Sequence, residues 1–162
     1  MTDQELIEKY PWLRISNRWT GEYIEGAEGT ELDLMPSGWR KAFGEKMCEE
    51  INDELMAWPQ EDREKFRITD IKEKWAHLCF YTNLINTHLN QIIGKYSLIS
   101  RLTCIHCGKP ARWITRGWYM PYCQECAECA EEQMQHINSA YSVPTDWGAE
   151  FIDIDEYYKN ED

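Results

Sequence analysis

Two CxxC pairs in the second half of the chain have the spacing of a structural zinc site. Cys104 and Cys107 form the first pair, Cys123 and Cys126 form the second, and fifteen residues separate them. Zinc takes four tetrahedral ligands, and two residues between cysteines let both thiolates of a tight turn reach one ion. Four thiolates leave no open coordination position, so the sequence predicts a structural Zn²⁺ with these four ligands.

Other ligand sets remain open from spacing alone. Cys129 follows the second pair by another CxxC step and can replace one of its thiolates. His106 or His136 can also join the site. Cys48 and Cys79 lie on apolar faces of expected elements and are predicted to be core residues.

The segments around the cysteines predict the type of zinc finger. Residues 111–115 and 118–122 flank Arg116-Gly117 and are typical of a hairpin. Residues 127–140 have a helical pattern, which places Cys126 in or beside the first helical turn. A knuckle, a hairpin and a helix at the second CxxC indicate a treble-clef finger, with a zinc ribbon as the alternative.

The rest of the chain predicts an α+β body that positions this finger. Apolar residues recur every four positions over 38–57 and again with helical spacing over 84–100, so each segment should form an amphipathic helix. Short β-branched and aromatic runs between them predict an antiparallel hairpin over 66–82. Residues 10–15 are expected to be an extended arm, and 20–36 a loop. The resulting division is a body over 1–100, a zinc module over 101–140 and an acidic, aromatic tail over 141–162.

Composition excludes several classes of protein. The 162 residues are 43% hydrophobic and 13% aromatic, which is too apolar for a disordered chain. No stretch is long and apolar enough to span a bilayer, the N-terminus lacks a secretory pattern, and paired cysteines fit a reducing compartment, so the cytoplasm is expected. A net charge of −12 argues against a surface that coats nucleic acid, although residues 66–126 are net basic.

No arrangement of residues indicates catalysis. The four histidines are scattered, and neither a GxxxxGK nor an HExxH motif is present. Acidic pairs such as Asp153 with Asp155 are weak indications of a nuclease without partners elsewhere in the sequence. The sequence therefore predicts a protein that is not an enzyme.

The cysteine pairs and several aromatic segments together resemble a family of small phage and prophage proteins, over roughly residues 10 to 126. The sequence is also similar to phage-encoded type II-A anti-CRISPR proteins, which inhibit RNA-guided DNA nucleases. Trp75-Ala76-His77 stands where the family usually has an aromatic residue and two glycines, which leaves the shape of that turn open. The segments that carry the resemblance are Tyr10-Pro11-Trp12-Leu13, Gly38-Trp39-Arg40, Ile71-Lys72-Glu73-Lys74-Trp75, Leu78-Cys79-Phe80-Tyr81, Cys104-Ile105-His106-Cys107-Gly108-Lys109-Pro110, Gly117-Trp118 and Cys123-Gln124-Glu125-Cys126.

The resemblance implies stoichiometric inhibition of a Cas9-type nuclease of the bacterial host by an acidic surface. The competing hypothesis is a zinc-dependent module that binds nucleic acid through basic and aromatic side chains. Candidate residues for the protein partner are Glu45, Glu49, Glu50, Asp53, Asp153, Asp155 and Glu156, and those for nucleic acid are Lys109, Arg112, Trp113, Arg116 and Trp118.

Overall fold

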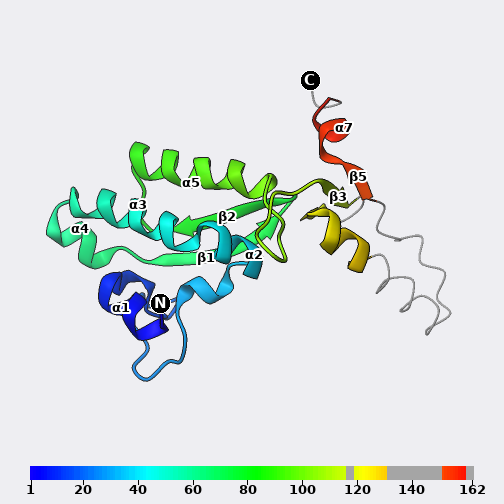
Figure 1. The fold of residues 1–162 in the computed structure, drawn as a ribbon. Helices are drawn as coiled ribbons and strands as arrows, with labels where there is room; N and C mark the ends of the chain where they lie inside the picture. Colours follow the sequence, from blue (N-terminus) through cyan, green and yellow to red (C-terminus); the bar gives the residue numbers. More distant parts are fainter. Residues whose placement is uncertain (116–118, 131–150, 160–162) are drawn as a thin grey trace.

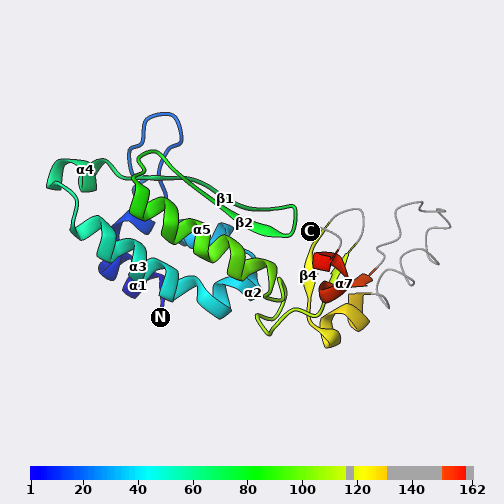
Figure 2. The same ribbon diagram turned by 90° about the horizontal axis from the view of Figure 1, so that it is seen from above.

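The computed structural model describes residues 1–115, 119–130 and 151–159, which form a helical body and a smaller C-terminal module side by side (Figures 1 and 2). The body contains one two-stranded sheet, and the module contains a three-stranded sheet. The predicted fold class is confirmed: helices combine with small antiparallel sheets, and four cysteines cluster in the C-terminal half.

The predicted hairpin is present as β1 (Ile68–Lys74) paired antiparallel with β2 (His77–Thr82). Lys74 pairs with His77, so Trp75 and Ala76 alone make the turn. Both have positive φ angles, 53° and 65°, as a two-residue type I′ turn requires. Although glycine is absent, the turn is still left-handed, and Trp75 and Ala76 have a backbone conformation that residues with a side chain rarely adopt.

The first predicted amphipathic helix, 38–57, is present but not uniform. It consists of α2 (Ser37–Trp39), a π-helical segment, η3 (Arg40–Gly44), and α3 (Glu45–Met56). The second, predicted over 84–100, is α5 (Thr87–Arg101). It begins three residues late because the Asn86 side chain accepts a hydrogen bond from Leu89 N at 2.8 Å and caps the helix there.

The body core lies where α3, α5 and the hairpin meet. α5 packs against both α3 and β2, and it lies beside them in both ribbon views (Figures 1 and 2). The largest side chains that are almost completely buried include Trp39, Tyr10, Tyr96 and Phe66. Aliphatic side chains from several elements of the body fill the space between these rings, among them Leu13, Met47, Ile51, Ile68, Leu78 and Leu89.

The prediction of an extended arm at 10–15 was wrong. The chain begins with α1 (Asp3–Lys9), whose capping box joins Thr2 and Glu5, and continues into the 3-10 helix η1 (Pro11–Leu13). Proline suits the first position of a helix because its φ is already helical and it lacks only an N–H that would be unpaired there. Two more short helices were missed, η2 (Glu31–Leu34) inside the predicted loop and α4 (Gln60–Lys65) after α3.

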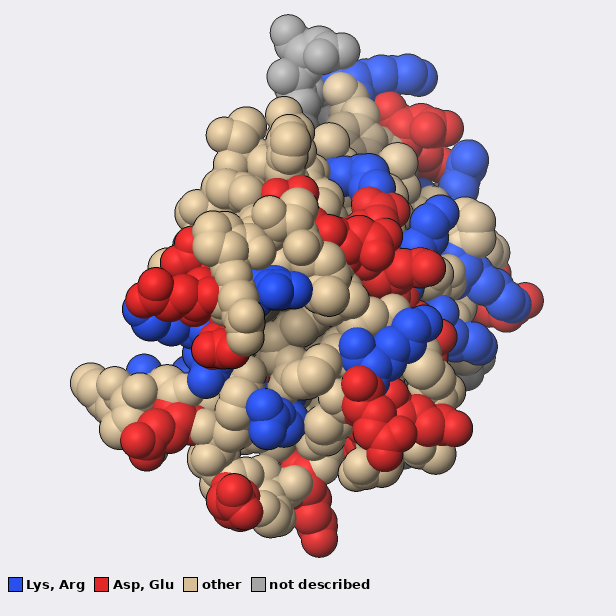
Figure 3. Space-filling model, turned by 90° about the vertical axis from the view of Figure 1, so that its left-hand side faces the viewer, with Lys and Arg blue, Asp and Glu red and all other residues tan. Residues whose placement is uncertain are grey.

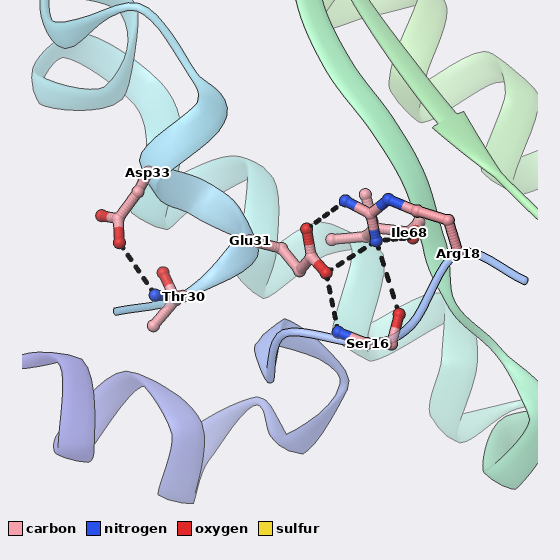
Figure 4. Close-up of polar contacts among 6 residues, drawn as sticks. All are labelled: Ser16, Arg18, Thr30, Glu31, Asp33 and Ile68. Atoms are coloured by element: carbon pink, nitrogen blue, oxygen red, sulfur yellow. Dashed lines mark hydrogen bonds and ion pairs between the residues drawn. The ribbon is translucent and has the colours of Figure 1, made fainter. Parts of the chain in front are cut away.

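A buried carboxylate fixes the segment between η1 and η2 to the body (Figure 4). The Glu31 side chain is only 3% exposed, and Arg18 donates to its two oxygens at 2.7 and 2.5 Å. Glu31 also accepts from Ser16 N at 3.0 Å, while Arg18 reaches the Ile68 carbonyl at 2.9 Å. This network joins residues 16–31 to strand β1.

The C-terminal module has the strand order β4-β3-β5. The predicted finger hairpin appears as β3 (Trp113–Thr115) and β4 (Pro121–Tyr122), and residues 124–130 are helical. The rest of the helix predicted to reach residue 140 lies outside the described residues. From the tail, β5 (Phe151–Asp153) adds to the open edge of β3, and α7 (Ile154–Lys159) follows it. The tail therefore supplies a strand that docks on the sheet of the module.

No helix within the described ranges combines the length and the apolarity that a membrane crossing needs.

Candidate metal centre

The four predicted cysteines come together in space. The Sγ atoms of Cys104, Cys107, Cys123 and Cys126 all lie within 4.8 Å of one another, and Cys107 Sγ is 3.5 Å from Cys123 Sγ. A tetrahedral ion with Zn–S bonds of about 2.3 Å requires an S–S separation of about 3.8 Å. Two of the four residues are buried and two are half-buried. These thiols can therefore hold a metal ion, and their donor set fits zinc.

Backbone hydrogen bonds shape the first CxxC pair into a knuckle. Gly108 N donates to the Cys104 carbonyl at 3.0 Å, and Cys104 N donates to the Lys109 carbonyl at 2.7 Å. Gly108 has a φ of +81°, which glycine adopts without strain. At the second pair, Cys126 N donates to Cys123 Sγ at 3.4 Å, and the helix at 124–130 follows directly. Knuckle, hairpin and helix thus have the order predicted for a treble-clef finger.

The knuckle is built against the body. A Cβ atom on Gly38 would lie 2.2 Å from the Cys104 carbonyl oxygen, and one on Gly108 would lie 2.6 Å from the Gly38 carbonyl oxygen. Gly38 N donates to the Ile105 carbonyl at 2.9 Å, and Trp39 Nε1 donates to the Thr103 carbonyl at 2.9 Å. Both glycines are therefore needed for this close approach, which positions the metal centre on α2.

Burial and hydrogen bonding shift the pKa values of three of the thiols in different directions. Burial is the largest effect on Cys107 and raises its pKa, but hydrogen bonds from the Lys109 backbone and the other three thiols outweigh it and lower the pKa to about 7. Burial raises the pKa of Cys123 and that of Cys126. The pKa of Cys107 is thus lowered, whereas those of Cys123 and Cys126 are raised, so a divalent cation would supply the positive charge that favours thiolates at these positions.

Of the other candidate ligands, Cys129 and His106 do not belong to the cluster. Cys129 is exposed and stands apart from it, while His106 Nδ1 lies 3.5 Å from Cys126 Sγ and so borders the site from outside. His136 lies outside the described residues. Cys48 is buried, as expected of a core residue, and burial raises its pKa to about 12. Cys79 is only half-buried.

The acids predicted to bind a protein partner have different surroundings. Glu45, Glu49 and Asp53 are exposed at four-residue spacing along one helical face, and we call them the acidic row. Glu50 instead faces α5, where it pairs with Lys95 and accepts from Tyr96 Oη at 2.8 Å. In the tail, Asp153 and Asp155 lie 2.7 and 3.7 Å from Arg112, and Glu156 is exposed.

Several residues predicted to bind nucleic acid are engaged within the chain. Arg112 pairs with the two tail aspartates, and Lys109 pairs with Glu125 at 2.9 Å. Trp113 Nε1 hydrogen-bonds Gln124. Arg116 and Trp118 lie outside the described residues. The two cations of the finger that the structure describes, Lys109 and Arg112, therefore already lie next to carboxylates.

Sequence reasoning missed the contact between the body hairpin and the module. Ala76 is 2% exposed and forms a small second core with Ile114 and Ile154. The rings of Trp75 and Tyr119 are 6.0 Å apart. The one sequence feature that could have indicated this contact is the absence of glycine from a two-residue turn that favours it. Contacts with another part of the protein can hold non-glycine residues in such a strained turn.

Comparison with protein-family models, with curated proteins and with solved structures finds no match to this chain.

Proposed function

We propose that this chain is a phage-encoded anti-defence protein that uses a structural Zn²⁺ to shape its C-terminal module and inhibits a Cas9-type RNA-guided DNA nuclease by stoichiometric binding. The acidic row carries the proposal. Its carboxylates repeat at i, i+4 and i+8 on a helix whose opposite face is fixed in the core, so they form a rigid line. Glu45 lies 3.6 Å from the N-terminal ammonium. Such a line complements the positively charged channel in which these nucleases hold nucleic acid.

Exposed aromatic surface favours a protein partner as well. Trp19 is 97% exposed, although the neighbouring Arg18 is fixed by buried Glu31 (Figure 4). Tryptophan is enriched among the residues that dominate protein interfaces. A tryptophan that contributes little burial to its own fold, on an anchored segment, is suited to anchoring a partner.

Nucleic-acid binding by the finger is the weaker candidate. Phosphate binding draws on accessible cations, and here Lys109 and Arg112 are each paired with carboxylates of the same module. Breaking these pairs would oppose binding of a polyanion. The two hypotheses differ in a measurable way, because binding through cations weakens steeply with salt.

The decisive experiment is a DNA-cleavage assay with a purified type II-A nuclease and its guide RNA, titrated with the metal-loaded protein. We expect cleavage to stop near an equimolar ratio, and to be restored when the acidic row is reversed by Glu45→Lys, Glu49→Lys and Asp53→Lys. The matched control changes Glu22, Glu25 and Glu28 to Lys, which alters net charge equally on an exposed loop. Full cleavage at a large molar excess, or equal loss of inhibition in both triple variants, would contradict the proposal.

A further inference from the structure

A pocket lies between η1, the end of α3 and α4, far from the metal centre, at the end of the molecule viewed in Figure 3. Its volume is about 380 Å³, which is the size of site that small organic ligands occupy. The apolar part of its lining is Pro11, Trp12, Leu55 and Met56. Trp12 is rigidly placed, because its Nε1 donates to Asn52 Oδ1 at 3.1 Å and its ring contacts Phe66 edge-on.

Two arginines that line this pocket have donors to spare. The Nε atom of Arg63 is buried without a hydrogen-bond partner, and its Nη1 has only the Met56 sulfur at 3.4 Å, a weak acceptor. Arg14 donates from Nε to the Pro11 carbonyl at 3.0 Å. Neither guanidinium is paired with a carboxylate in the described part of the chain. Within the described residues the Arg63 guanidinium thus makes no hydrogen bond to an oxygen atom, so an anionic oxygen that reaches its terminal amino groups would gain a charge-assisted hydrogen bond.

An aromatic residue holds the cations in place. The guanidinium carbon of Arg14 lies 3.8 Å from the ring centroid of Tyr23, and that of Arg67 lies 3.9 Å from it. Arg67 donates from Nε to the Gly21 carbonyl at 2.6 Å and from Nη1 to the Glu64 and Phe66 carbonyls. Tyr23 therefore stacks with two cations, and one of them, Arg14, also lines the pocket.

We propose that this pocket binds a small ligand in which a planar aromatic ring carries an anionic phosphate or carboxylate group. The ring would lie among Trp12, Pro11 and Met56, and the anionic oxygens would accept from Arg63 and Arg14. Glu64 also lines the pocket and opposes the anion; its carboxylate accepts from Gln60 Nε2 at 2.9 Å.

Short-range contacts, and not a long-range electrostatic field, should determine which ligands this pocket binds. The face in Figure 3 carries lysine, arginine and acidic side chains interspersed, without a broad basic patch. A long-range field therefore contributes little to attracting an anion, and the short-range geometry of the two guanidinium groups dominates. The site requires both parts of the ligand, the ring and the charge.

The test is a titration of the full-length, metal-loaded protein, observed by NMR at the Trp12 indole N–H and the Arg63 Nε–H. The probes are phenyl phosphate and benzoate, with benzamide as the neutral ring and inorganic phosphate as the anion without a ring. We expect saturable shifts at both groups with phenyl phosphate or benzoate, and at least tenfold weaker binding of benzamide and of inorganic phosphate. The stronger of the two anionic probes identifies the preferred anionic group.

Variants tie the binding to the two arginines. Arg63→Gln should weaken binding about tenfold or more, because one charge-assisted contact is lost. Glu64→Gln should strengthen it, and Arg101→Gln, which makes the same charge change on α5, should leave it unchanged. Thermal unfolding checks that each variant folds; if Arg63→Gln does not, Arg14→Gln takes its place. Equal binding of benzamide, no saturable shift with either anion, or identical affinity in the arginine variants would overturn the proposal.

Discussion

The body and the C-terminal module differ in what holds them together. In the described residues the body core contains 19 buried side chains, whereas the core of the module and the hairpin tip contains three: Ala76, Ile114 and Ile154. Burial of each large apolar side chain stabilises a fold by about 1.5–3 kcal/mol, and ordering the chain opposes it with a similar total. The body therefore has a core that can fold by burial, whereas we expect the module to depend on the metal ion that its four thiols can hold.

The difference also explains where function is expected. The module carries a closed set of four thiols, which suits a structural role, and the exposed acidic row and the pocket beside α4 both lie on the body. The metal centre is nevertheless built onto the body through Gly38 and Trp39. The metal centre therefore determines the structure of the module. The acidic row on α3 and the pocket beside α4 are held in place by the body core.

Removing one thiolate should have the largest effect. Cys104→Ser should abolish tight metal binding and unfold the module, because the metal contributes on the order of 10 kcal/mol to folds of this kind. Metal content by mass spectrometry and near-ultraviolet circular dichroism measure the result. Cys129→Ser is the matched control, since Cys129 is exposed and lies outside the cluster. Full metal content in Cys104→Ser, or equal loss in the control, would contradict the assignment.

A cavity in the body core should destabilise the body without affecting metal binding by the module. Ile51 is completely buried on α3, so Ile51→Ala should lower the free energy of unfolding of the body by about 2–5 kcal/mol. Metal content should not change. Denaturant unfolding followed by body tryptophan fluorescence gives the first quantity. If the variant loses metal in proportion to its loss of stability, metal binding by the module depends on the stability of the body, and the two regions are not independent.

The contact between α3 and α5 should depend on pH. The hydrogen bond from Lys95 and that from Tyr96 lower the pKa of Glu50 below its ordinary 4.5, against the effect of burial. A carboxylate with a lowered folded pKa stabilises the fold above about 4.5, and that contribution is lost as pH falls through the folded value. Glu50→Gln should therefore be less stable than the wild type at pH 7, by about 1 kcal/mol. The difference should shrink below pH 4.5, whereas the exposed control Glu49→Gln should show little difference at either pH.

The smallest effect should come from the hairpin tip that joins the two regions. Ala76→Gly relieves a left-handed φ of 65° but removes a methyl group buried against the module, so the two effects nearly cancel with metal present. After chelation the methyl loses its partners, and the same change should stabilise the body by about 0.8 kcal/mol more than before. Equal effects in both conditions would show that the hairpin and the module are not coupled.

The sequence predicted the parts of the fold that repeat regularly or have a fixed spacing. The stripe from Trp39 to Leu55 and the two CxxC pairs have such patterns, and both are present. The short helices at 3–9, 11–13, 31–34 and 60–65 were missed because a few turns leave no period, and their start signals are single residues such as Thr2 and Pro11.

Tertiary pairing was beyond sequence reasoning. Nothing in the spacing shows that Arg112 meets Asp153 or that Glu50 turns toward α5, so residues with the same charge could not be divided into internal partners and free surface. The close approach of Gly38 to the first CxxC pair was also unforeseen, although Gly38-Trp39 belongs to the segments that carry the phage-protein resemblance.

Amide hydrogen exchange of the wild-type protein, with and without a zinc chelator, tests the central claim most directly. The account predicts that chelation removes protection from the knuckle, from β3 and from β4, while α3, α5 and the body hairpin away from its tip keep theirs. Protection that is unchanged at 103–126 would show that the module folds without metal. Protection that disappears equally from both regions would show that the body depends on the metal as much as the module does.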